Sequence, residues 1–160
     1  MKKDSPHSST IRIIGLGNGM RGDDAVGLMA ARRIRQELGD RVEVIEAEMA
    51  GVDLIDLMKG ASVAILIDAV RSGKAPGSVH RLDASVSPIG GQGFSRSSHA
   101  IGVSEAIELA RAMDVLPATV IVYGVEVGNT EIGQPLSPPM GEALDQVLKQ
   151  IILECEAHHT

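Results

Sequence analysis

Apolar residues gather in short runs along this chain, and the runs alternate with segments in which apolar residues recur at helical spacing. A run of consecutive apolar residues bounded by glycine or polar residues is typical of a strand buried on both faces. Runs of this kind, interrupted by a few polar residues or glycines, cover residues 11–16, 62–69 and 118–126. The stretch over 42–47, Val-Glu-Val-Ile-Glu-Ala, predicts a further strand. A shorter alternating stretch over 78–83 follows a Pro-Gly turn, which favours a strand at the sheet edge.

Helices are expected between and after these strands. A buried stripe with residues four apart predicts a helix that ends at Gly39; its members are Val26, Ala30, Ile34 and Leu38. Further helices are predicted over 51–59 and 101–113. A last helix should begin near Ser137-Pro138, a good cap and first-turn pair, and carry the clearest apolar stripe of the chain, from Met140 to Cys155.

Strands and helices alternate from end to end without an internal repeat. This order predicts an α/β fold, a three-layer sandwich in which helices cover both faces of a mostly parallel, twisted sheet with one short edge strand. With 160 residues and 44% apolar content, the chain is long enough for one core. We therefore expect a single domain over 11–155, a disordered lead over 1–10 and a tail over 156–160.

The first strand runs into a glycine-rich turn that ends in two adjacent carboxylates, Asp23 and Asp24, where a helix should start. Carboxylates suit the exposed N–H groups of a first helical turn, but capping requires only one of them. The glycines of the turn, at positions 17, 19 and 22, also fit a dinucleotide site with Glu46 as its acidic residue. Against that alternative, two negative charges would lie where the pyrophosphate should dock.

Three polar side chains follow the expected strands and the long loop: Asp24, Asp68 and His99. Ligands of parallel sheets bind beyond the carboxyl ends of the strands, and a parallel sheet can bring these three together there. Two carboxylates and an imidazole suit nickel, zinc, iron or manganese, with positions left open for a partner's ligands or water. The alternative to a metal site is that these residues have structural roles. Asp24 and His99 would then each cap a helix, and Asp68 would form a hydrogen bond with a loop.

Composition removes several classes of function. The net charge of −6 opposes broad nucleic-acid binding, and one Tyr, one Phe and no Trp leave no stacking platform for single strands. The single Cys155 rules out an internal disulfide framework and is expected in the core. No run of eighteen apolar residues occurs, so we expect a soluble, cytoplasmic protein with no membrane partner.

Two further expectations concern the middle of the chain. His80, on the edge strand, is expected at the surface. The loop over 85–98, rich in glycine and serine, is expected to be a mobile flap that orders when a partner binds. Phe94 is expected either to be partly exposed and to contact that partner, or to fold back against the protein as a hydrophobic plug.

On its motifs, the chain resembles the hydrogenase maturation endopeptidases over about residues 11–153. These enzymes trim the C-terminus of the large subunit of nickel-iron hydrogenases. The most specific motif is Gly15-x-Gly17-Asn18 followed by Asp23-Asp24-x-x-Gly27, in which the family carries an acidic residue, Glu or Asp, at the second carboxylate. The other motifs are Asp68-Ala69, Ser98-His99-x-x-Gly102 and Gly124-Val125-Glu126.

The resemblance implies a metal-binding trio of Asp24, Asp68 and His99. It also implies a substrate that already carries nickel, namely the precursor of the large subunit, so that nickel is supplied by the substrate and other divalent ions can substitute. Asp24 and Asp68 are the candidate catalytic residues: either is a possible general base, and polarisation of the scissile carbonyl by the metal is the alternative.

One departure from the family pattern bears on activity. Where many members have Asp-Gly-Gly-Thr after the second strand, this chain has Glu46-Ala47-Glu48-Met49. This substitution adds a charge and removes two glycines near the expected cleft. It keeps open a second hypothesis, a non-catalytic maturation chaperone of the same fold, beside the less favoured dinucleotide-binding module.

Overall fold

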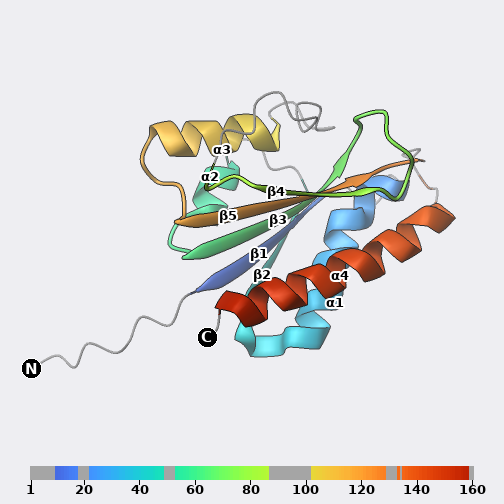
Figure 1. The fold of residues 1–160 in the computed structure, drawn as a ribbon, viewed down its shortest axis with the longest axis horizontal. Helices are drawn as coiled ribbons and strands as arrows, with labels where there is room; N and C mark the ends of the chain where they lie inside the picture. The colour runs from blue at the N-terminus through green and yellow to red at the C-terminus, as the bar shows by residue number, and fades with distance from the viewer. Residues whose placement is uncertain are drawn as a thin grey trace, which may run out of the picture.

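The computed structural model describes residues 10–17, 22–48, 53–86, 102–128, 133 and 135–158. Within them a five-stranded sheet has the order β2-β1-β3-β5-β4 (Figure 1). The strands are β1 (Ile11–Leu16), β2 (Glu43–Ala47), β3 (Val63–Val70), β4 (Val79–Asp83) and β5 (Thr119–Glu126). Four of them run parallel, and β4 pairs antiparallel with β5 at one edge. The predicted mostly parallel sheet with one short edge strand is confirmed.

Helices cover both faces of this sheet (Figure 1). They are the 3-10 turn η1 (Gly22–Ala25), α1 (Val26–Leu38), the 3-10 turn η2 (Gly39–Arg41), α2 (Asp53–Met58), α3 (Val103–Ala112) and α4 (Pro138–His158). α1 and α4 pack on one face, and α2 and α3 on the other. α1 ends at Gly39, whose φ of 55° closes the helix as the sequence predicted.

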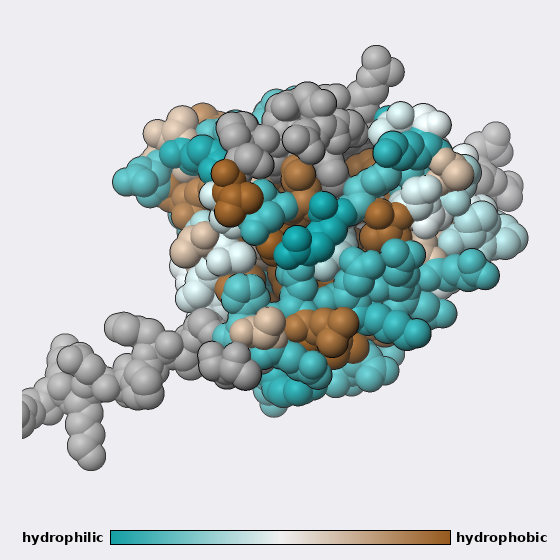
Figure 2. Space-filling model, viewed as in Figure 1, coloured by the Kyte–Doolittle hydropathy of each residue, from teal (hydrophilic) through white to brown (hydrophobic). Residues whose placement is uncertain are grey.

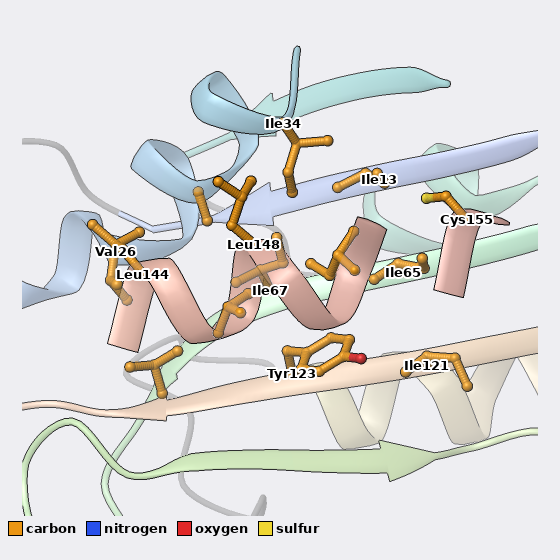
Figure 3. Close-up of a cluster of buried hydrophobic side chains, with 14 of the residues drawn as sticks. Ile13, Val26, Ile34, Ile65, Ile67, Ile121, Tyr123, Leu144, Leu148 and Cys155 are labelled. Carbon is orange, nitrogen blue, oxygen red and sulfur yellow. The ribbon is translucent and has the colours of Figure 1, made fainter. Parts of the chain in front are cut away.

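The core consists of two apolar layers because side chains alternate between the faces of each buried strand. Ile65 and Ile67 of β3 pack under α1 and α4, whereas Ala64 and Leu66 pack under α2 and α3. Figure 3 shows the first layer, with Cys155 of α4 inside it. Burial and the nearby charge of Glu154 raise the pKa of the Cys155 thiol to about 11, so the predicted packing role of this residue is confirmed.

Two boundaries differ from the sequence prediction. The strand predicted over 62–69, with its end placed at Asp68, covers Val63–Val70, because Ala69 and Val70 pair with Val125 and Glu126 of β5. α4 continues through His158, so residues 156–158, predicted as a tail, belong to the helix. The lead over 1–9, most of the predicted flap, Phe94 and His99 lie outside the described residues.

The exterior is mixed in character. Figure 2 shows hydrophilic residues over much of the visible face, with small hydrophobic patches between them. Among the described residues, no helix combines the length and apolar character needed to cross a bilayer.

Candidate functional site

Glycines allow the start of α1 to press against the ends of β1 and β3. A Cβ on Gly27 would lie 2.1 Å from the carbonyl oxygen of Leu16 and 2.5 Å from that of Ile67. A Cβ on Gly17 would lie 2.2 Å from the carbonyl oxygen of Asp24. Since no side chain fits in these gaps, the glycines set how closely η1 and α1 approach the sheet.

This packing brings Asp24 and Asp68 to one corner at the carboxyl ends of neighbouring strands. Asp24 lies in η1, three residues before Gly27, and Asp68 directly follows Ile67, whose carbonyl Gly27 approaches. Both are buried, at 4% and 2% exposure, and Asp68 Oδ1 accepts a hydrogen bond of 2.9 Å from the Ala69 N–H. The elements that carry the two aspartates, η1 and β3, are therefore in contact, and a shared site of the two carboxylates stays a prediction.

Asp23 has a different role from the cap expected from the sequence. The residue at the N-cap of α1 is Ala25, and no side chain caps that helix. Asp23 is fully buried and accepts three hydrogen bonds, each 2.7 Å long, from the Gly128 N–H, the Ser137 N–H and the Ser137 hydroxyl. It therefore joins η1 to the segment after β5 and to the start of α4.

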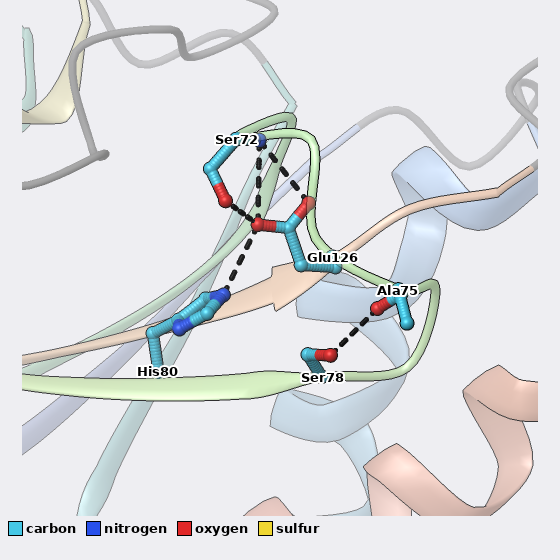
Figure 4. Close-up of polar contacts among 5 residues, drawn as sticks. All are labelled: Ser72, Ala75, Ser78, His80 and Glu126. Carbon is cyan, nitrogen blue, oxygen red and sulfur yellow. Dashed lines mark hydrogen bonds and ion pairs between the residues drawn. The ribbon is translucent and has the colours of Figure 1, made fainter.

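His80 is not the surface residue that the sequence suggested. Its side chain is 23% exposed, and its Nε2 lies 3.0 Å from Oε1 of Glu126, which is almost fully buried. Figure 4 shows the Glu126 carboxylate between His80 of β4 and Ser72, which donates its N–H and its hydroxyl. Glu126 thus ties the turn after β3, and β4, to the end of β5. Only the family resemblance had drawn attention to Glu126.

Glu46 faces α1. It is the acidic residue at the position where many family members have the Asp of Asp-Gly-Gly-Thr. It accepts hydrogen bonds from Arg32 at 2.6 Å and from Arg35 at 2.8 Å. The hydrogen bond from Arg35, followed by the contacts with Arg32, lowers the pKa of Glu46 despite partial burial. Glu48 is exposed. The acidic side chain at position 46 therefore forms ion pairs between β2 and α1.

The third predicted ligand, His99, belongs to the segment that precedes α3 and is not described, so its place beside Asp24 and Asp68 stays a prediction. Within the part of the chain that the structure describes, no three His, Cys, Asp or Glu side chains are grouped to hold a metal ion. The roles of Asp24 and Asp68 as oxygen donors of the predicted set likewise stay predictions.

Comparisons with known proteins agree with this fold. The family model of the hydrogenase maturation proteases (HycI) matches residues 26–154. The chain is 27% identical to the hydrogenase 2 maturation protease of Escherichia coli (strain K12), over 89% of the chain and 88% of that protein. It is 24% identical to the hydrogenase expression/formation protein HupD of Thiocapsa roseopersicina, over 89% of the chain and 66% of HupD, just under two thirds of its length.

Solved structures share the fold. The hydrogenase maturating endopeptidase HybD from E. coli superposes with a TM-score of 0.79 at 24% identity, covering 92% of this chain and 93% of HybD. The hydrogenase maturation protease HycI from Thermococcus kodakarensis gives a TM-score of 0.68 at 22% identity, covering 94% of each chain.

The match to the family model, together with the three-layer α/β sandwich, places the chain among the maturation proteases, which are endopeptidases. The chain belongs to the hydrogenase maturation protease family. The family predicted from the sequence motifs is confirmed, and the alternatives of a maturation chaperone and a dinucleotide-binding module are not favoured.

Proposed function

We propose that this protein recognises the nickel-loaded precursor of a nickel-iron hydrogenase large subunit and removes its C-terminal peptide. The observation that carries this proposal is the burial of two carboxylates, Asp24 and Asp68, on elements that meet at the carboxyl ends of β1 and β3. The family membership supports it, as does the E. coli relative, which is by name a maturation protease for hydrogenase 2. The cytoplasmic location stays a prediction.

Asp24, Asp68 and His99 are the residues that would hold the nickel of the precursor. Two carboxylate oxygens and an imidazole nitrogen suit nickel and other divalent ions, and three protein ligands leave positions for groups of the substrate. When bound at such a set, a divalent ion polarises a carbonyl or lowers the pKa of water. Asp24 and Asp68 then have two possible tasks, to orient the scissile peptide and to accept the proton of the attacking water.

Cleavage of the precursor tests the proposal directly. Purified protein incubated with nickel-loaded precursor should release a short C-terminal peptide, visible as a loss of mass from the large subunit. Asp24→Ala and Asp68→Ala should abolish the release. Asp145→Asn, which removes an exposed carboxylate paired with Arg33 at 2.8 Å, should not.

Two outcomes would contradict the proposal. An unchanged mass of the cognate precursor, with the precursor bound, would favour the chaperone hypothesis. Undiminished cleavage by Asp68→Ala would support the protease activity but contradict the assignment of Asp68 to its site.

A further inference from the structure

Asp23 is buried beside the proposed ligand Asp24, yet its carboxylate makes bonds that lead away from the site. We propose that Asp23 is a positioning residue of this protease, which fixes the orientation of η1 and thereby the place of the Asp24 carboxylate. The inference rests on the proposed function, because Asp24 must be a ligand for its position to matter. The proposal adds Asp23 to the residues on which the site depends, although the carboxylate of Asp23 accepts its hydrogen bonds from Gly128 and Ser137.

Both oxygens of Asp23 are needed as acceptors. Oδ1 accepts from the Ser137 N–H, and Oδ2 accepts from the Gly128 N–H and the Ser137 hydroxyl, each at 2.7 Å. The two backbone N–H groups can only donate. An asparagine has one acceptor oxygen and an NH2 group, so Asp23→Asn must leave one of these N–H groups facing another donor.

The partners of Asp23 belong to a packed junction of several segments. A Cβ on Gly128 would lie 3.3 Å from Asp23 Oδ2 and 3.3 Å from the Cβ of Pro76, in the turn between β3 and β4. A Cβ on the neighbouring Gly77 would lie 2.9 Å from Pro139, in the first turn of α4. The turn after β3, the segment after β5 and the start of α4 therefore close around the Asp23 carboxylate.

The junction matters for Asp24 because it is attached to the same short element, η1. This element is a four-residue 3-10 turn, and α1 begins behind it without a side-chain cap. On the sheet side, Gly17 and Gly27 set the distance of η1 from β1 and β3. On the other side, Asp23 holds the turn to the junction. Without its bonds, the turn can rotate and carry Asp24 away from the position that a ligand requires.

Affinity for Co²⁺, measured by calorimetry on the folded proteins, tests this role. Loss of a residue that supports a ligand weakens metal binding by about 10- to 100-fold, and we expect this of Asp23→Asn. Ser137→Ala removes only the hydroxyl donor and should cause a smaller loss. Asp145→Asn breaks a different link between α1 and α4 and should bind Co²⁺ as the wild type does.

A merely structural role would give a different result. Asp23→Asn would then unfold at a lower temperature but bind Co²⁺ with wild-type affinity when folded, and this outcome would overturn the proposal. If Asp23→Asn does not fold, Ser137→Ala decides: a weaker affinity supports the proposal and an unchanged one overturns it.

Measurements on Asp24→Ala and on the wild type distinguish a failure of the proposed function from a failure of the Asp23 proposal. If the wild type binds Co²⁺ and Asp24→Ala binds it equally well, the ligand assignment is wrong and the role of Asp23 is overturned with it. If the wild type binds no Co²⁺ but cleaves the precursor, a wild-type kcat/KM in Asp23→Asn overturns the Asp23 proposal alone. A wild type that neither binds nor cleaves overturns both.

Discussion

All four buried acidic residues of the described chain lie at the carboxyl edge of the sheet: Asp23, Asp24, Asp68 and Glu126. Burial of a carboxylate is costly unless hydrogen bonds or opposite charges compensate it. Asp23 and Glu126 accept hydrogen bonds from segments distant in sequence, and so hold the edge together. Asp24 and Asp68 lie at the same edge, and they are the pair that we propose for the site.

The contacts of individual residues were also the features that the sequence predicted least well. The adjacent acids Asp23 and Asp24 look alike in the sequence, yet the structure separates them by their partners. The donors to Asp23 lie 105 and 114 residues further along the chain. Such a contact has no periodicity, and its acceptor and donors are common residue types. The contact between His80 and Glu126, 46 residues apart, escaped prediction for the same reason.

Glu46 permits a test of pH dependence at one residue. Its pKa in the folded protein is lowered from the usual 4.5 by Arg35 and Arg32, so the ion pairs stabilise the fold above that pH and lose this contribution as the pH falls through the folded pKa. Glu46→Gln should lower the free energy of unfolding by about 0.3–1 kcal/mol near neutral pH, because both pairs are exposed to solvent. Urea unfolding of both proteins from about pH 3 to pH 8 measures this difference.

The difference between wild type and Glu46→Gln should shrink toward the acid end of that series. Glu48→Gln, which removes the same charge at an exposed position two residues on, serves as the control. A difference that persists undiminished in acid would show that the ion pairs with α1 are not what Glu46 contributes. Cleavage of the precursor should be unaffected by either change.

At the scale of elements, the sequence was a good guide wherever a whole face is buried. All eight residues of β3 are buried, as its mostly apolar run indicates, and the stripe of α1 is buried at each of its four predicted positions. The exact ends were less predictable. β3 extends past Asp68 because β5 is there to pair with it, and the pairing partner is not encoded in the run itself.

Two helical glycines provide a matched test of how α1 sits on the sheet. Gly27 in α1 would carry its Cβ into the backbones of β1 and β3, whereas a Cβ on Gly141 in α4 meets nothing within 4 Å. Gly27→Ala should therefore destabilise the protein by about 1–3 kcal/mol or more, because backbone atoms must move. Gly141→Ala should stabilise it by about 0.5–1 kcal/mol, since alanine favours the helix.

Urea unfolding of both glycine variants gives these free energies. Because both substitutions add the same methyl group to a helix, opposite signs isolate the effect of contact with the sheet. Equal stabilisation by both would mean that α1 has room above Leu16 and Ile67. The position of Asp24 would then have no basis in glycine packing.

At the scale of the whole molecule, the proposed site makes global stability depend on metal. A ligand that binds only the folded state stabilises it in proportion to the logarithm of its concentration above Kd. Co²⁺ at 100 times its Kd should add about 2.7 kcal/mol, which for a chain of this size raises Tm by about 5–10 °C. Removal of the ion with a chelator should restore the original Tm.

The same measurement tests a ligand that lies outside the described residues. His99→Ala and Asp68→Ala should each lose most of the Co²⁺-dependent rise in Tm at the same ion concentration, because each removes one of three proposed protein ligands. His80→Ala should lower Tm through the loss of its contact with Glu126, yet keep the rise with Co²⁺. The opposite result, in which His80→Ala abolished the rise and His99→Ala retained it, would contradict the choice of His99. The imidazole of the site would then be that of His80 on β4, which contacts Glu126.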